Sequence, residues 1–265
     1  MVYIAPTLPI PEWLPDDTDD SIVGVEWHQE AIGALAYALR VVTLRRGASW
    51  GVCEQVELGG LRRPSGRDYA PRPDVMVLAQ PLPGHRSSIS LGEAGTPLFI
   101  AEVASSTTVR NDREGKRLAY AAVGVPEYVI FDPVGDVLDE PVEAWRLARP
   151  EDRTYVRWEP DAEGYWRSTS LDIALRPRPP FLEVRDRDGL VLDTPLGTFE
   201  RARRLEEYVR QAEQEVQQAQ LQARQAEQQA RQAEQQARSF EQQLQAAQQE
   251  IEELRRRLQG DQGKV

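Results

Sequence analysis

The chain has 265 residues, of which 40% are hydrophobic and 28% are charged, which is typical of a folded protein with one or two domains. Its single cysteine, Cys53, cannot form an intramolecular disulfide, and no apolar run approaches the roughly 20 residues needed to cross a bilayer. The first residues lack the basic start and apolar core of a signal peptide. These features argue against secreted disulfide scaffolds and membrane proteins, and they predict a cytoplasmic protein.

The net charge of −11 is unevenly distributed along the chain. Residues 1–30 hold seven acidic side chains and no lysine or arginine, so the chain as a whole lacks the basic surface typical of nucleic-acid-binding proteins. One local exception lies between Arg40 and Arg72, which contains seven arginines. Four of them are candidate contacts for DNA phosphates, with ordinary surface arginines as the alternative: Arg45, Arg46, Arg62 and Arg63.

Composition divides the chain into four parts. Residues 1–20 form an acidic, proline-rich arm that is extended and either mobile or bound to the surface. Residues 21–197 are expected to form the main domain, residues 198–259 a coiled coil, and residues 260–265 a disordered tail.

The main domain opens with a predicted helix at 24–46, since its apolar residues recur at helical spacing and Gly47 follows. Strands are expected at 52–58, where apolar and polar residues alternate irregularly, and at 74–78, 98–103 and 128–131, where short apolar runs suit burial on both faces of a sheet. Another helix is expected at 111–123, and loops are expected at 59–72 and 80–97. Antiparallel strands are expected within 142–194, at 142–147, 155–158, 165–168, 182–184 and 190–192. The pattern predicts a mixed α/β domain with flanking helices.

The coiled-coil prediction depends on the spacing of apolar residues and alanines. From 202 to 258 these residues are three and four positions apart without a break over eight heptads, and residues 201–259 contain neither glycine nor proline. Alanine occupies every seam position from 219 to 237, whereas larger side chains return in the last third. We expect one helix from about 198 to 258 that pairs with a second copy, and a lone solvated helix is the alternative.

Three residues carry the candidate chemistry. Asp74 starts one buried strand, Glu102 lies near the end of the next, and Lys116 follows on the helix. Lys116 and Lys264 are the only lysines among 32 basic residues. Two carboxylates on adjacent strands can hold a cation such as Mg²⁺, and a nearby lysine can orient water or stabilise a charged phosphate. The alternative is that Asp74 caps a loop and Glu102 pairs with an arginine.

If both carboxylates reach one cation, they should lie within about 6 Å of each other, with the lysine amine directed to the same place. Asp112 and Tyr120 lie four residues on either side of Lys116 and so share its helix face. Glu26 and His28 on the first helix are weaker candidates, for which a solvated or packed helix face is the alternative reading.

Two segments resemble the Uma-two family of restriction-endonuclease-like proteins. They are PDVMVL at 73–78 and PLFIAEVASSTTVRNDREGKRLAYAAVGVPEYVIFDP at 97–133. The residues that match the family pattern are Asp74, Glu102, Ser105, Asp112, Lys116, Tyr120, Gly124, Val125, Glu127, Tyr128, Asp132 and Pro133. The resemblance covers roughly 25–200 and is most specific over 97–133.

The resemblance implies a PD-(D/E)xK nuclease core in which Asp74 and Glu102 bind Mg²⁺ or Mn²⁺. That superfamily usually carries its lysine two residues after the glutamate, where this chain has Ala104, so Lys116 would be the substitute. The implied function is a metal-dependent endonuclease acting on DNA. The alternative is a catalytically inactive nuclease fold that serves as a coiled-coil oligomerisation or partner-binding module, which the acidic charge and the long tail favour.

Overall fold

The chain is described from a computed structural model and divides into two compact units, Met1–Glu200 and Arg201–Val265. The residues that the structure describes are 3–12, 26–192, Gly197, and the helical positions 209–211, 213–225, 227–229, 231–232, 236, 238–239 and 243–245. Among these residues, no helix combines the length and apolar character needed to cross a bilayer.

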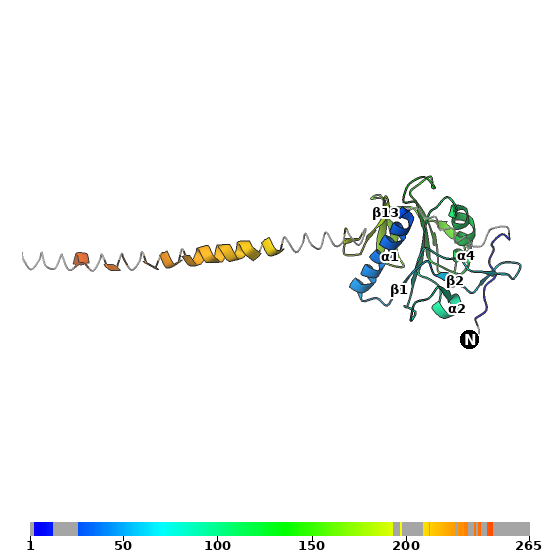
Figure 1. Ribbon diagram of the computed structural model, residues 1–265, viewed down its shortest axis with the longest axis horizontal. Coiled ribbons are helices and arrows are strands. Elements are labelled where there is room, and N and C mark those ends of the chain that lie inside the picture. Colours follow the sequence, from blue (N-terminus) through cyan, green and yellow to red (C-terminus); the bar gives the residue numbers. More distant parts are fainter. Residues whose placement is uncertain are drawn as a thin grey trace, which may run out of the picture. The chain divides into compact units, whose positions relative to one another are not determined.

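A six-stranded mixed sheet forms the centre of the first unit (Figure 1). Its strands run in the spatial order β1-β5-β7-β8-β9-β10, and only β7 and β8 are parallel neighbours. The bounds are β1 (Gly51–Glu54), β5 (Val75–Leu78), β7 (Phe99–Val103), β8 (Glu127–Phe131), β9 (Val142–Leu147) and β10 (Tyr155–Arg157). A parallel pair needs a crossover connection, and the helical segment 109–122 provides it.

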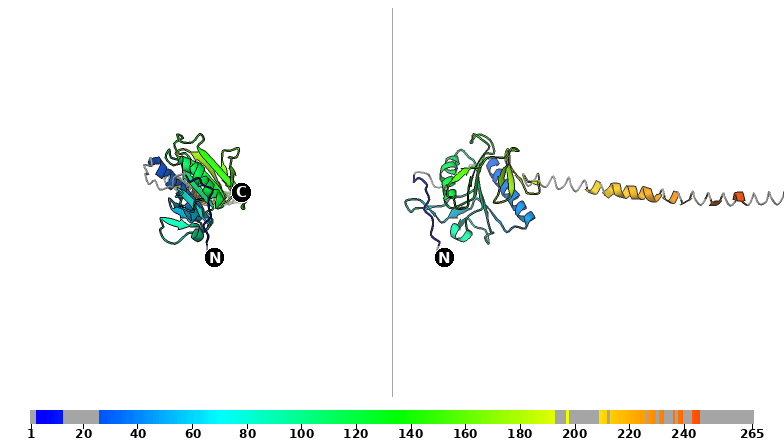
Figure 2. Two further views of the ribbon diagram at one scale, coloured as in Figure 1. Left: turned by 90° about the vertical axis from the view of Figure 1, so that its right-hand side faces the viewer. Right: turned by 180° about the vertical axis from the view of Figure 1, so that it is seen from behind.

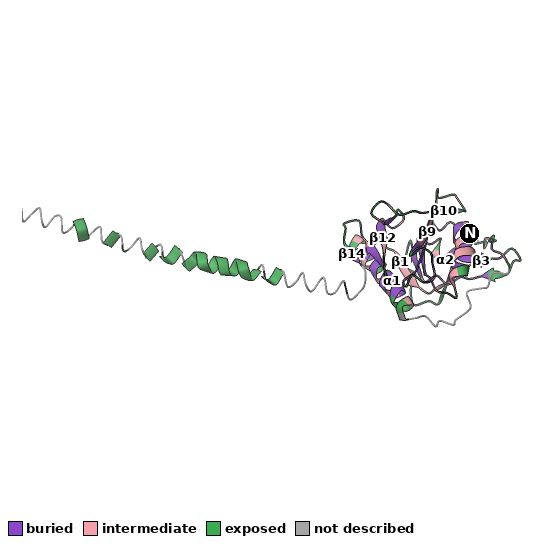
Figure 3. Ribbon diagram, turned by 90° about the horizontal axis from the view of Figure 1, so that it is seen from above, coloured by how far each residue is buried: buried purple, intermediate pink, exposed green. Residues whose placement is uncertain are grey.

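The two faces of this sheet are covered by different helices, as Figure 1 and the view from behind in Figure 2 also show. Phe99, Ala101 and Val103 of β7 join a core with α1 (Glu26–Arg46), because alternate side chains of a strand point to one face. Ile100, between them, joins a second core with the helix that ends in α4 (Arg117–Ala122). Every residue of β5, β7 and β8 is buried, which explains their nearly continuous apolar sequence (Figure 3).

A second, four-stranded antiparallel sheet shares the core of α1. Its strands are β11 (Trp166–Ser168), β12 (Ile173–Arg178), β13 (Phe181–Arg185) and β14 (Val191–Leu192). Apolar residues of this sheet, of α1 and of the six-stranded sheet belong to one cluster, which explains why α1 carries buried residues around much of its circumference. The sequence did not predict β12 as a strand, because Pro177 interrupts its pattern.

Short elements lie within segments that composition predicts as loops. They are β3 (Leu61–Arg62), β4 (Asp68–Tyr69), β6 (Ser88–Ser90) and α2 (Leu91–Ala94). The strand expected at 52–58 is instead two strands, β1 and β2 (Glu57–Gly59), separated by a break at Gln55, which has a positive φ of 50°. The Gln55 N–H donates to the carbonyl of Asp74 at 3.0 Å, so the break ties the end of β1 to the start of β5.

The described part of the N-terminal arm, residues 3–12, is bound to the domain surface. Thr7 forms a parallel bridge with Arg62, and the Leu8 N–H donates to the Arg62 carbonyl at 2.6 Å. Leu8 and Ile10 are each only 1% exposed within the core on the α4 side. The sequence left open whether the arm is mobile or bound to the surface, and residues 3–12 are bound. Residues 13–20 lie outside the described part.

In the second unit, the described positions between 209 and 245 are helical and exposed. The exposed side chains include Val209, Val216 and Leu244, which occupy the predicted seam. The helix expected from 198 to 258 is thus seen only at those positions. The other positions, including the predicted disordered tail at 260–265, lie outside the described residues.

The bound arm should contribute measurably to stability. Leu8→Ala removes a fully buried side chain, so we expect the free energy of unfolding in urea to fall by about 2–5 kcal/mol. Ile4→Ala, on the same arm at 84% exposure, is the matched control and should change it by less than about 0.5 kcal/mol. Equal effects of the two substitutions would contradict the packing of the arm.

Candidate active site

Asp74 and Glu102 meet where β5 begins and β7 ends. Val75 pairs with Ala101, so the register places Asp74 opposite Glu102. The Asp74 N–H donates to Glu102 Oε2 at 3.1 Å, and the Val103 N–H donates to Asp74 Oδ2 at 2.8 Å. The structure therefore brings the two acidic residues side by side, each carboxylate bonded to the backbone of the other strand.

Glu102 is 1% exposed, so its carboxylate depends on partners inside the protein. Tyr120 Oη donates to Oε1 at 3.1 Å, and Lys116 Nζ lies 3.2 Å from Oε2. Both partners come from the helix that crosses from β7 to β8. The carboxylate is thus held by a hydroxyl, an ammonium and a backbone N–H.

A π-helical turn positions the lysine. The crossover helix consists of α3 (Val109–Asn111), the π-helical turn η1 (Asp112–Lys116) and α4. Residues four apart on a helix are neighbours on its surface, so Asp112 and Lys116 lie side by side at the two ends of this turn. Lys116 Nζ is 3.0 Å from Asp112 Oδ1 and 3.5 Å from the Arg72 carbonyl, and both side chains of the ion pair are buried.

Tyr128 supports this cluster from the sheet. Its hydroxyl donates to the Asp112 carbonyl at 3.0 Å, and its ring packs edge-on against Tyr120 with centroids 5.2 Å apart. Burial raises the pKa of Tyr128 well above its usual value, and the negative charges of Glu102 and Asp112 raise it further. The hydroxyl therefore remains a hydrogen-bond donor at any physiological pH.

His28 reaches the same sheet end from the other face. Its Nε2 lies 2.9 Å from the Val103 carbonyl oxygen and 3.9 Å from Asp74 Oδ2. The site is therefore assembled from both faces of the sheet, with α1 contacting Asp74 and the crossover helix contacting Glu102. Asp74 is also the more accessible acid, with a side chain 15% exposed against 1% for Glu102.

The other supporting candidates lie farther from the carboxylates or outside the described part. Ser105 Oγ accepts from the Thr108 N–H at 3.2 Å and contacts the Thr108 hydroxyl at 2.9 Å, so it organises the start of the crossover helix. Glu26 is the first residue of α1, and its side chain lies outside the described residues.

The four arginines predicted to contact DNA make contacts within the protein. Arg45 Nε donates to Asp186 at 3.0 Å, and Arg46 donates to the carbonyls of Leu171 and Asp172, so both tie α1 to the second sheet. These two also lie about 26 Å along α1 from His28, given the helical rise. Arg63 is fully buried and donates to the Pro11 carbonyl. Arg62 is exposed and pairs with Asp68. Contact of these four arginines with DNA phosphates stays a prediction.

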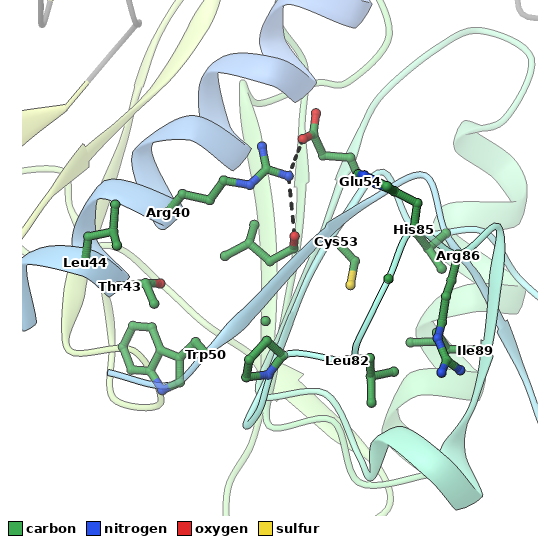
Figure 4. Close-up of a pocket in the computed structure, with 15 residues that line it drawn as sticks. Arg40, Thr43, Leu44, Trp50, Cys53, Glu54, Leu82, His85, Arg86 and Ile89 are labelled. Carbon is green, nitrogen blue, oxygen red and sulfur yellow. Dashed lines mark hydrogen bonds and ion pairs between the residues drawn. The ribbon is translucent and has the colours of Figure 1, made fainter. Parts of the chain in front are cut away.

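A separate groove of about 570 Å³ runs beside β1, between α1 and the loop at 81–89 (Figure 4). Its arginine Arg40 pairs with Glu54 at 2.6 Å and donates to the Val52 carbonyl. Cys53 also lines this groove, and burial raises the pKa of its thiol, although nearby Arg40 lowers it. A thiol kept protonated is a poor nucleophile, so Cys53 is poorly suited to nucleophilic catalysis.

Two backbone carbonyls belong to the site although residue patterns did not single them out, and Tyr128, which matches the family pattern, was given no role from the sequence. The Val103 carbonyl oxygen lies 2.9 Å from His28 Nε2. The Arg72 carbonyl oxygen lies 3.5 Å from Lys116 Nζ. Main-chain atoms carry no signature in residue type. Only their positions in the sequence could have indicated them, since Val103 directly follows Glu102 and Arg72 lies two residues before Asp74.

The oxygen atoms at this sheet end suit a hard divalent cation. Among the described residues, no group of three His, Cys, Asp or Glu side chains is arranged to hold a metal ion. Mg²⁺, however, commonly binds one or two carboxylates and keeps several waters. Asp74, Glu102 and the Val103 carbonyl offer such donors, and one His28 nitrogen contacts both the Val103 oxygen and Asp74. The donor set therefore fits Mg²⁺ or Mn²⁺.

Comparison with known proteins places this site in a family. The family model Uma2, described as a putative restriction endonuclease, matches residues 21–185, which is more than half of the chain. The chain belongs to the Uma2 family. No curated protein matches it. Membership supports a nuclease-like function with a nucleic-acid substrate, and the matched span contains all the residues of the site.

Within the Uma2 match, Asp132 organises the loop at the same edge of the sheet. It follows β8, which runs parallel to β7 and therefore ends beside Val103. Its carboxylate accepts four backbone N–H groups, from Val134 at 3.1 Å and from Gly135, Val137 and Leu138 at 2.8 Å. Burial alone would raise the pKa of Asp132, but these four donors outweigh it and lower the pKa.

Asp132→Asn should therefore destabilise the Uma2 domain in a pH-dependent way. The folded-state pKa is depressed, so the ionised carboxylate stabilises the fold above its unfolded pKa, and that stabilisation is lost as pH falls through the folded pKa. We expect the substitution to lower the free energy of unfolding in urea by about 1–3 kcal/mol at pH 7. This difference from the parent chain should become smaller below about pH 4. Asp136→Asn, exposed in the same loop, is the control. A loss of unfolding free energy that stays the same at every pH would contradict the stabilising role of the ionised carboxylate.

Proposed function

We propose that this chain is a divalent-metal-dependent endonuclease that hydrolyses phosphodiester bonds in DNA. The observation that carries the proposal is the contact of Lys116 Nζ with Glu102 at 3.2 Å, beside an Asp74 whose amide binds the same carboxylate oxygen. Two acids and a lysine at one sheet end supply both a cation site and a positive group. Family membership supports the nuclease class.

Asp74 and Glu102, with the Val103 carbonyl, would hold Mg²⁺ or Mn²⁺. When bound, such a cation stabilises negative charge on the phosphoryl group and promotes ionisation of water. Asp74 is the accessible ligand, whereas Glu102 is fixed by its buried partners. His28, which contacts Asp74 and the Val103 carbonyl, keeps these two oxygens oriented to the same place.

Lys116 would orient the attacking water or stabilise the negative charge that develops on the phosphate. Its side-chain nitrogen is shared between Glu102 and Asp112. Asp112 is thus a positioning residue, since it holds Nζ at 3.0 Å.

A nuclease assay with Mg²⁺ and with Mn²⁺ tests the proposal. Asp74→Asn and Lys116→Met should each lower the cleavage rate by at least 100-fold, because one removes a cation ligand and the other the positive group. Glu151→Gln, at an exposed turn 70% accessible to solvent, should leave the rate unchanged.

Two controls separate catalysis from folding. Each variant should keep the far-ultraviolet circular dichroism of the unsubstituted chain, and Asp74→Asn should weaken Mg²⁺ binding measured by calorimetry while Glu151→Gln should not. Cleavage by Asp74→Asn at the full rate would rule out this site. An inactive parent chain that binds no divalent cation would favour the alternative, a nuclease fold without catalysis.

The alternative function, an oligomerisation or partner-binding module, rests on the second unit. Val209, Val216 and Leu244 lie on the seam and are each more than half exposed in the single chain. Exposed apolar side chains in a regular heptad pattern are typical of helices that associate. We propose that this tail joins two copies, which would give a nuclease two sites, one for each strand of a duplex.

Sedimentation tests the association. Deleting residues 240–265 should convert a dimer to a monomer, because the larger apolar seam residues lie there. Leu244→Lys, on the seam, should weaken association, whereas Leu221→Lys, off the seam and equally exposed, should not. A full-length chain that sediments as a monomer at micromolar concentration would contradict the proposal.

A further inference from the structure

Trp27 is the only exposed aromatic side chain among residues 26–192, at 46% of its surface. The other tryptophans in that range are half-buried or buried: Trp50, Trp145, Trp158 and Trp166. A single exposed apolar residue is ordinary on a protein surface, so its position decides whether it has a role.

That position is the first turn of α1, next to the site. The following residue, His28, contacts the Val103 carbonyl at 2.9 Å and lies 3.9 Å from Asp74. Trp27 is therefore one residue from the side chain that touches two of the proposed cation ligands. Val134, 57% exposed, follows β8 and so lies at the same edge of the sheet.

The charge of the protein gives a second, independent reason to expect a non-ionic contact. The chain carries a net charge of −11, and Arg45, Arg46 and Arg63 are bonded within the protein. The net charge therefore does not attract the phosphates of DNA over long range. Stacking of a base on an aromatic ring needs no positive charge and contributes about 1–3 kcal/mol per base.

We propose that Trp27 is a stacking residue for an unpaired base beside the phosphodiester bond that is cut. A base inside a duplex has both faces covered by its neighbours, so an indole can stack only on a base that is single-stranded, flipped or terminal. The substrate class is therefore DNA with unpaired nucleotides at the cleavage point. This inference rests on the proposed function and specifies its substrate.

Fluorescence anisotropy with the full-length chain tests it, using a labelled single-stranded oligonucleotide and a duplex of the same sequence whose two ends are closed by non-nucleotide linkers, with Ca²⁺ in place of Mg²⁺. Trp27→Ala should weaken single-strand binding by about 5- to 100-fold, which corresponds to the stacking energy, and Trp27→Phe should retain most of it. Duplex binding should change less than twofold. Leu44→Ala, which removes an exposed side chain 81% accessible on the same helix, is the control.

Intrinsic fluorescence supplies a second measurement. Stacking quenches tryptophan emission, so the single-stranded oligonucleotide should quench the parent chain more than Trp27→Phe. Equal loss of single-strand and duplex binding in Trp27→Ala, or no loss in either, would overturn the inference. If the parent chain cuts DNA but Trp27→Ala binds and cuts normally, the inference fails alone. If the parent binds single strands through Trp27 without cutting, the inference holds and the proposed function fails.

Discussion

The burial of the Glu102 carboxylate is the constraint on which the site depends. Glu102 lies in a strand whose other residues are all apolar and buried, and an ionised group there requires several partners. Three neighbouring segments supply them: the start of β5 with its Asp74 amide, η1 with its ammonium, and α4 with its tyrosine hydroxyl. Loss of any one would leave a buried charge poorly compensated, which typically costs more than the interaction itself contributes. The carboxylate thus fixes how the crossover helix sits on the sheet.

Much of the sheet and its helices could be predicted because burial controls residue pattern there. Continuous apolar runs predicted β5, β7 and β8, and helical spacing predicted α1 to within two residues of its observed start. β12 and β6 were missed for a physical reason. Pro177 interrupts one strand, and the short edge element at Ser88–Ser90 pairs through its backbone with β2 rather than through an apolar face. Backbone pairing of that kind leaves little trace in residue type.

The candidate site was only partly predictable. Residue types identified Asp74, Glu102 and Lys116, since ionised groups in apolar surroundings are costly and stand out. Their supporting atoms did not, because a carbonyl such as that of Val103 has no residue signature. The arginines show another limit of the sequence, because partners inside the protein can be distant along the chain. Arg45 resembles a phosphate contact in sequence, but its partner Asp186 lies 141 residues away, and only the folded chain reveals that pair.

The location of the lysine on a helix has a consequence for how the site is held together. Position 104, two residues after Glu102, would supply a lysine from the strand itself, and here it is a buried alanine. A lysine on the strand would be fixed by the pleat, which places residues two apart on one face. Lys116 instead depends on the packing of the crossover helix and on its ion pair with Asp112, four residues earlier. Asp112 is therefore needed for a reason that a strand lysine would not have. Its ion pair holds the lysine amine in place, whereas a lysine on the strand would be held in place by the strand backbone.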